Sequence, residues 1–347
     1  MRSRAVAAVD ASVHYPDPEY RMLRHALAER ERKQYRKKAA EQLSFTAVDP
    51  QGGRVILEEE IICGNGAAEV MFTLASALRP RKALLAVPSF FEYEQALVCA
   101  GCAVHHYYLK KEQNFRLDGD FLSSVSADTD IIILGNPNNP TGRFIDREVL
   151  CELLEFCRQR NIFLVLDESF FDFLKESDRK RTMEGVERIH DYSGLFIIRS
   201  FTKMYAMPGL RFGYGICSDR KLLEQMRSLM QPWNVSVPAE AAAVAAAEEL
   251  EFAGETAEKT AENREQMKLW MEEAGYRVYP SSTNFLLFQA DKQLKELCQK
   301  RGFLIRDCSN FPGLEMTEDG RSWFRICVRS REENEALMNV LREIKQI

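Results

Sequence analysis

Short apolar runs alternate with longer amphipathic stretches over most of this chain. Wholly apolar runs predict strands that are buried on both faces, and they lie at residues 83–87, 131–134, 162–166 and 195–198. Residues 92–100 and 147–160 carry apolar side chains at helical spacing, and residues 103–109 predict another strand. Helices between buried strands predict an α/β fold, in which a large domain has a mainly parallel sheet covered by helices on both faces.

The pattern changes in the last third of the chain. Residues 239–250 are rich in alanine and residues 251–273 are charged with helical periodicity, which predicts a long helical connection. Alternation of strand and helix patterns then resumes, at residues 278–289, 292–300, 303–306, 323–328 and 332–344. We therefore predict an N-terminal arm at 1–20, a large domain at 21–250 and a smaller C-terminal α/β domain at 251–347.

The first part of the large domain begins with an amphipathic helix. Within residues 19–38, Tyr20, Leu23 and Leu27 have helical spacing, and Ala26 lies on the same face. Its basic run, residues 30–38, is interpreted as a solvated helix face rather than a binding patch.

A glycine-rich turn then connects a strand to a helix. Residues 55–63 predict the strand, and Gly64-Asn65-Gly66-Ala67-Ala68-Glu69 leads into a helix at 70–78. Small residues at a helix start leave the first backbone N–H groups open, which suits a phosphate. A plain tight turn is an equal alternative.

Composition and charge exclude several classes of protein. The 347 residues carry a formal net charge of -5, and the sequence pI is about 5.8. These values argue against nucleic acid or an anionic membrane as the main partner. We find no apolar run of transmembrane length and expect no signal peptide. Nine cysteines, an odd number scattered through apolar stretches, predict reduced thiols in the cytoplasm.

One cysteine pair has the spacing of half a zinc site. Cys99 and Cys102 are followed by His105 and His106, but no second cysteine pair follows at a suitable distance. Gly101 between them is typical of the residue that ends a helix before a strand. We therefore expect no metal here.

The strongest candidate for chemistry is a lysine in the loop after the strand at 195–198. Lys203 lies three residues after Ser200 and eight before Arg211. An amine beside a hydroxyl and a guanidinium suits pyridoxal phosphate, in which the lysine bonds the aldehyde and the other two hold the phosphate. The spacing alone is weak, because most loop lysines lie on the surface.

Other residues at strand ends could serve the same cofactor. Phe90 could stack on a heteroaromatic ring or belong to the core. Asn139 lies in a proline-rich loop that could aim its amide at a fixed oxygen, or form only a turn. Asp167 could pair with a pyridinium nitrogen or cap a helix. Arg325 could clamp a substrate carboxylate or form a surface ion pair.

Together these residues resemble a known family, the class I and II aminotransferases, which are fold-type I pyridoxal-phosphate enzymes. The resemblance covers nearly the whole chain and rests on motifs in the family's order and spacing: Asn139-Pro140-Thr141-Gly142, Asp167-Glu168, Ser200 with Lys203, and Arg211.

The resemblance implies a role for each site residue. Lys203 would carry pyridoxal 5'-phosphate, and Asp167 would pair with its ring nitrogen. The other cofactor contacts would come from Asn139 at the ring hydroxyl, Phe90 at the ring face, and Ala67, Ala68, Ser200 and Arg211 at the phosphate. Arg325 and Asn284 would bind the substrate. Tyr15 would reach the phosphate of a neighbouring subunit, which implies a homodimer with shared sites.

Within this family the chain is most similar to the branch that holds threonine-phosphate decarboxylase and histidinol-phosphate aminotransferase. Phe170 resembles the decarboxylase, because many aminotransferases have a tyrosine at that position. The branch usually has an N-terminal arm with a His-Gly-Gly motif, and that arm helps the decarboxylase to hold a substrate phosphate. Here fourteen residues precede Tyr15 and the motif is not among them.

These features predict an enzyme that acts on an amino acid. Decarboxylation of threonine phosphate is the first expectation, and transamination of histidinol phosphate or an aromatic amino acid is the alternative. A third reading is a non-catalytic protein that senses pyridoxal phosphate. Such proteins normally carry a DNA-binding module, and no basic helix-turn-helix segment is apparent in the sequence.

Overall fold

The computed structural model describes residues 2–41, 56–317 and 319–345. Its main sheet has seven strands in the order β1-β7-β6-β5-β4-β2-β3. All neighbours from β3 to β6 are parallel, whereas β7 is antiparallel to both β6 and β1. The strands are β1 (Ile61–Asn65), β2 (Lys82–Val87), β3 (Ala103–Tyr108), β4 (Ile131–Gly135), β5 (Phe163–Asp167), β6 (Leu195–Ser200) and β7 (Phe212–Ile216).

Apolar side chains on both faces of each central strand explain this buried sheet. In β4, Ile131 and Ile133 belong to one apolar cluster, and Ile132 and Leu134 belong to another. Successive residues of a strand point to opposite faces, so both faces are covered. The mainly parallel α/β fold expected from the sequence is confirmed.

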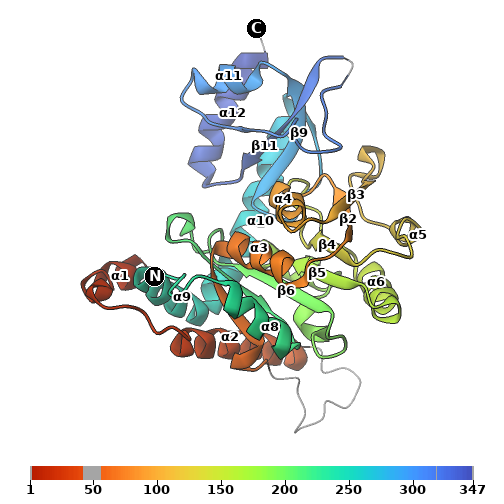
Figure 1. Ribbon diagram of the computed structural model, residues 1–347. Coiled ribbons are helices and arrows are strands. Elements are labelled where there is room, and N and C mark those ends of the chain that lie inside the picture. The colour runs from red at the N-terminus through yellow and green to blue at the C-terminus, as the bar shows by residue number, and fades with distance from the viewer. Residues whose placement is uncertain (1, 42–55, 318, 346–347) are drawn as a thin grey trace.

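Helices cover the two faces of the main sheet (Figure 1). The first cluster contains residues of α3 (Gly66–Leu78), α4 (Phe91–Cys99) and α8 (Arg220–Leu229). The opposite cluster contains residues of α2 (Arg21–Glu41), α6 (Arg147–Arg160) and α9 (Val237–Glu248). The short helices α1 (Arg2–Ala7) and α5 (Asp120–Ser123) lie at the periphery in Figure 1, and a further short helix is α7 (Glu176–Arg179).

A second, antiparallel sheet lies beyond α10 (Leu250–Glu273), in the blue part of Figure 1. Its four strands run in the order β10-β11-β9-β8. They are β8 (Arg277–Val278), β9 (Phe285–Asp291), β10 (Arg306–Asp307) and β11 (Arg321–Cys327), accompanied by α11 (Leu294–Gln299) and α12 (Arg331–Lys345). The predicted domain boundaries are not tested by these elements and stay a prediction.

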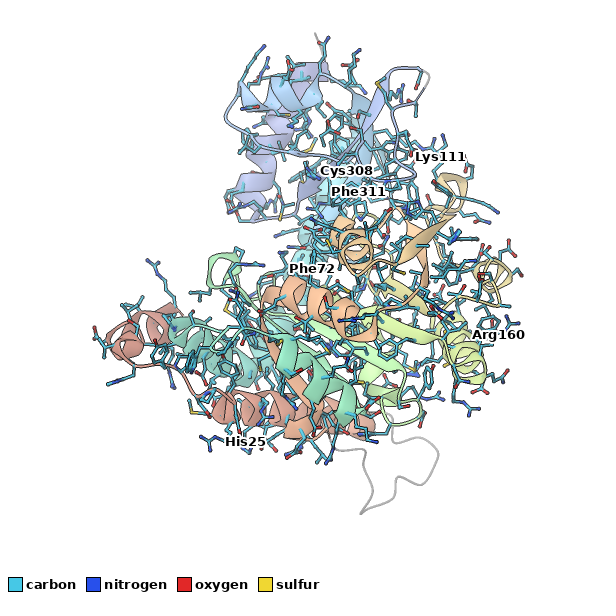
Figure 2. The ribbon with its side chains drawn as sticks, in the orientation of Figure 1. His25, Phe72, Lys111, Arg160, Cys308 and Phe311 are labelled. Atoms are coloured by element: carbon cyan, nitrogen blue, oxygen red, sulfur yellow. The ribbon has the colours of Figure 1, made fainter. Side chains whose placement is uncertain are left out.

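The second sheet joins two different cores. On β9, Leu286 and Phe288 pack with α10, α11 and α12, whereas Phe285 and Leu287 pack into the cluster of the main sheet. On β11, Trp323 likewise faces the main sheet. Figure 2 shows Cys308 and Phe311 at the junction of the two parts, and both belong to the main cluster.

Three local expectations differ from the structure. The first strand begins at Ile61, after a 3-10 turn at Glu58–Glu60, and residue 55 lies outside the described residues. The helix predicted at 70–78 begins at Gly66. The basic run is not simply a solvated face, because Arg30 is only 2% exposed. The Arg30 side chain is buried and forms an ion pair with the carboxylate of Asp172. Its helix otherwise buries Leu23 and Leu27 as predicted.

None of the helices in the described ranges is both long enough and apolar enough to cross a membrane.

Candidate active site

A cavity of about 190 Å³ lies at the carboxyl ends of β4, β5 and β6, between the start of α3 and the second sheet. This is where parallel α/β sheets bind ligands. Its walls hold every predicted site residue except Tyr15 and Asn284. The lining includes Ala67, Ala68, Phe90, Asn139, Asp167, Ser200, Lys203, Arg211 and Arg325.

Lys203 presents its amine to this cavity from the loop after β6. Nζ donates a hydrogen bond to Oγ1 of Thr202 at 3.2 Å. The pKa of Lys203 is lowered, first by desolvation and then by the positive charges of Arg211 and Arg325. A lowered pKa leaves more of the amine unprotonated near neutral pH, as a nucleophilic or basic lysine requires.

Asp167 ends β5 and turns its carboxylate to the same cavity. Oδ2 accepts a hydrogen bond of 2.6 Å from the buried hydroxyl of Tyr93, and Oδ1 accepts one of 2.9 Å from the Ser169 amide. The next helical turn begins at Phe171, with Phe170 at its N-cap and no side-chain cap. The helix-cap alternative therefore does not fit Asp167, although Oδ1 closes a local turn.

The start of α3 forms a cradle beside the guanidinium of Arg211. Gly66 has φ of +82°, and a Cβ at this position would lie 2.5 Å from Nη2 of Arg211. Asn65 provides no side-chain cap, so the first amides of α3, including those of Ala67 and Ala68, are available to a ligand. Arg211 is fixed by a 3.2 Å hydrogen bond from Nη1 to the Pro208 carbonyl.

The opposite wall of the cavity combines Phe90 and Asn139, which follow strands of the main sheet, with Arg325 from the second sheet. Phe90 is the N-cap residue of α4 and meets the ring of Tyr93 edge-on, with centroids 5.5 Å apart. Asn139 accepts a hydrogen bond from Nη1 of Arg325 through its Oδ1. The Arg325 guanidinium lies 4.9 Å from the centre of the Phe285 ring. The amide nitrogen of Asn139 therefore remains available to a ligand oxygen.

These residues fit pyridoxal phosphate. Arg211 and the open amides of α3 would hold the phosphate, and the glycine at position 66 leaves room for it. Lys203 would bond the aldehyde, Phe90 would lie against the ring, and Asp167 would face its nitrogen. Ser200 is positioned by a 2.8 Å contact between its Oγ and Oγ1 of Thr202.

Tyr15 and Asn284 lie outside the cavity lining. The ring of Tyr15 packs on Trp233, with centroids 4.4 Å apart, and is 78% exposed. Asn284 precedes β9, and its Oδ1 is buried without a hydrogen-bond partner among the described residues. Their predicted roles stay predictions.

Sequence reasoning missed Tyr93, Thr202 and Glu92, which all line the cavity. Tyr93 lies three residues after Phe90, so one turn of α4 puts both on one side. Thr202 lies between Ser200 and Lys203, and its hydroxyl contacts both. Glu92 lies in the first turn of α4, where an acidic side chain is common without any ligand.

The cysteine pair has a structural explanation. Gly101 has φ of +82° just after α4, and the Cys102 amide donates to the Leu97 carbonyl at 3.0 Å, as in a helix-ending motif. In the ranges that the structure describes, no three His, Cys, Asp or Glu side chains are grouped to hold a metal ion.

Comparison with known proteins agrees with this geometry. The family model for aminotransferase class I and II matches residues 15–341. Threonine-phosphate decarboxylase from Salmonella typhimurium is 34% identical over 299 residues, which are 82% of this chain and 76% of that protein.

A second relative belongs to the aminotransferase side. Histidinol-phosphate aminotransferase from Bacillus velezensis is 31% identical over 298 residues, 83% of this chain and 78% of that protein. The crystal structure of histidinol-phosphate aminotransferase from Clostridium acetobutylicum superposes with a TM-score of 0.82 at 27% identity, covering 100% of this chain and 96% of that one.

Proposed function

We infer, because the chain belongs to the class I and II aminotransferase family, that it is a pyridoxal-phosphate-dependent enzyme acting on an amino acid. Our first choice of reaction is that of threonine-phosphate decarboxylase, and transamination is the second. The proposal rests on one observation: Lys203, Asp167 and the cradle at the start of α3 beside Arg211 all line the same cavity.

Each residue has a distinct task in this proposal. Bound pyridoxal phosphate supplies an electron sink that lets one substituent leave the substrate Cα. Asp167 keeps a positive charge at the ring nitrogen favourable, and Tyr93 holds that carboxylate in place. Arg325 binds the substrate carboxylate, and the depressed pKa of Lys203 allows its amine to carry a proton to or from Cα.

The two reactions differ in the group that leaves Cα. In decarboxylation the carboxylate departs as carbon dioxide, its bonding pair stays behind, and Cα takes up a proton. In transamination the Cα proton departs instead, with Lys203 as the base. Phe170 cannot donate a hydrogen bond to a ring hydroxyl, and its ring packs edge-on against Phe285 at 5.1 Å. This supports the decarboxylase, whose sequences resemble this chain at that position.

A second anionic group on the substrate also has support. Arg306 on β10 lies directly opposite Arg325 on β11, and opposed residues of neighbouring strands share a face. Within the described residues Arg306 has no carboxylate partner and donates to Asn310 at 3.2 Å. Two guanidiniums on one face suit a substrate that carries both a carboxylate and a phosphate.

We also propose a cytoplasmic homodimer. All nine cysteines are unpaired, as expected in a reducing compartment. Valines 6, 9 and 13, together with Tyr15, are more than half exposed near the N-terminus. Apolar surface of this kind is typical of a subunit interface.

The test is to incubate the purified protein with threonine phosphate, and separately with an amino acid and 2-oxoglutarate, while following carbon dioxide and glutamate. We expect carbon dioxide from the first mixture. Glutamate from the second mixture alone would favour transamination instead. Lys203→Ala should abolish both products and the visible absorbance of lysine-bound cofactor. A cofactor adduct that borohydride still traps in this variant would contradict the role of Lys203.

A further inference from the structure

A second polar cluster lies beneath the cavity, on the opposite face of the main sheet. Asp167 and Ser200 open into the cavity, whereas the residues next to them in sequence, Glu168 and Arg199, point the other way. Nη2 of Arg199 lies 3.0 Å from Oε2 of Glu168. Both residues are at most 4% exposed, so this contact ties the ends of β5 and β6 together inside the protein.

The cluster contains more carboxyls than guanidiniums. Its members are the guanidiniums of Arg30, Arg179 and Arg199 and the carboxyls of Glu31, Glu168, Asp172 and Glu184. Arg30 donates to Asp172 at 2.9 Å. Arg179 lies 3.5 Å from Glu184. Arg199 contacts the other two carboxyls, those of Glu31 and Glu168.

Those two carboxyls compete for the same nitrogen. Oε2 of Glu31 is 3.7 Å from Nη2 of Arg199, the atom that also contacts Glu168. The remaining oxygens accept hydrogen bonds of 2.6 Å, from the hydroxyl of Tyr214 to Glu31 and from the amide of Gly185 to Glu168. Two buried carboxylates on one guanidinium leave a net negative charge, which is costly away from water. A proton on one of them would remove this cost.

Glu168 is the candidate for this proton, because its pKa is raised. Burial raises the pKa of Glu168 to about 8, Glu184 and Glu31 add to the rise, and Arg199 opposes it. The groups that face Glu168 are Arg199 from β6, Glu31 from α2, and Glu184 with the Gly185 amide from the segment before β6.

The buried cluster and the cavity share two stretches of backbone, because Glu168 directly follows Asp167 and Arg199 directly precedes Ser200. The Glu168 amide donates to the Ile198 carbonyl at 2.9 Å, which extends the pairing of β5 with β6 beyond Asp167. Arg30 also contributes, because its Nη1 donates to the Tyr205 hydroxyl at 2.7 Å, two residues after Lys203. A change of charge beneath the sheet therefore acts on the backbone that aims Asp167 and Ser200.

We propose that Glu168 is a positioning residue whose neutral form completes the contact with Arg199 and thereby holds Asp167 and Ser200 at the cavity. Loss of its proton puts two full negative charges on one guanidinium, loosens the ends of β5 and β6, and weakens cofactor binding. The cofactor part of this proposal rests on the proposed function, whereas the titration of Glu168 does not.

The test compares Glu168→Gln, which fixes the neutral form, with the wild type between pH 7 and pH 9. The affinity of wild-type protein for pyridoxal phosphate should fall by roughly tenfold more than that of Glu168→Gln, equivalent to about 1.4 kcal/mol. Glu240→Gln is the matched control. Glu240 is also buried with a raised pKa, but it interacts with Asp17 and Tyr20 instead of the cluster. It should leave the pH dependence of cofactor affinity unchanged.

A second measurement needs no cofactor. Infrared difference spectroscopy of the full chain should show the C=O stretch of a protonated carboxyl at pH 7, which disappears as the pH passes about 8 and is absent in Glu168→Gln. The proposal is overturned if that band is missing from the wild type. It is also overturned if Glu168→Gln does not fold, or if its cofactor affinity falls with pH as steeply as that of the wild type. If the band titrates but no cofactor binds at any pH, the proposed function fails instead.

Discussion

At the scale of single residues, the carboxylate of Asp167 is fixed by two donors, Tyr93 and the Ser169 amide. Asp167→Ala should still bind cofactor but lose orders of magnitude in turnover, because the ring would no longer keep its proton. Tyr93→Phe should lose roughly tenfold in kcat, the lower end of what removing a supporting hydrogen bond behind a ligand costs. Tyr107→Phe is the control, since it removes a tyrosine–aspartate hydrogen bond outside the cavity. Near-normal turnover of Asp167→Ala would contradict this role, and Asp167 would then serve only to close its local turn with the Ser169 amide.

Glu92 contributes a negative charge near the amine of Lys203, as Asp167 also does. Its carboxylate raises the pKa of Lys203, against the larger lowering by desolvation and by Arg211 and Arg325. Glu92→Gln removes this opposing charge, so the pKa of Lys203 should fall further and the amine should react at lower pH. The rate of Lys203 acetylation in cofactor-free protein, followed by mass spectrometry against pH, measures this shift. Glu94→Gln in the same helical turn should cause none, because Glu94 pairs with His106. Equal curves for Glu92→Gln and the wild type would contradict the prediction.

At the scale of elements, the start of α3 is shaped by Gly66. Gly66→Ala would place a methyl group against the Arg211 guanidinium and force a side chain into the left-handed region. We expect a loss of roughly 1–2 kcal/mol in the free energy of unfolding from the backbone, together with weaker cofactor binding. Gly101→Ala has the same φ of +82° but nothing within 4 Å of its Cβ. It should lose stability and keep its cofactor affinity. Equal affinities in the two variants would show that the cradle does not hold the phosphate.

Much of this arrangement could be predicted from the sequence, because wholly apolar runs identify buried strands and polar motifs follow them directly. The sequence predicts Asp167 and Asn139 at strand ends for that reason, and in the structure Asp167 ends β5 and Asn139 follows β4. The burial of Arg30 differs from the prediction because helical periodicity does not reveal a partner 142 positions away, the carboxylate of Asp172. Tyr93 was missed for a similar reason. Its hydroxyl matters only once β5 brings Asp167 within 2.6 Å, and no local pattern contains that contact.

At the scale of the whole molecule, Tyr15 is the residue whose role depends on a second chain. If it reaches the partner's phosphate, Tyr15→Ala homodimers should bind cofactor more weakly, by about 1 kcal/mol for one lost hydrogen bond. Lys203→Ala homodimers should be inactive at both sites. Mixing the two variants and letting subunits exchange should restore one complete site in each hybrid, formed by the native Lys203 of one chain and the native Tyr15 of the other.

Cofactor affinity and turnover should therefore recover as the subunits exchange, and should not recover immediately after mixing. The time course of turnover against subunit exchange measures this. Hybrids that bind cofactor no better than the Tyr15→Ala homodimer would show that Tyr15 acts within its own chain or not at all.

The shared core has a consequence for synthesis of the protein. The main cluster contains Leu23 and Leu27 from α2 and also Phe285, Leu287 and Trp323 from the second sheet. A ribosome adds roughly 5–20 residues per second. For tens of seconds the nascent chain therefore has its N-terminal apolar surfaces without the strands that later cover them. Until Trp323 has left the exit tunnel, the emerging polypeptide offers chaperones a binding surface that the finished enzyme no longer has.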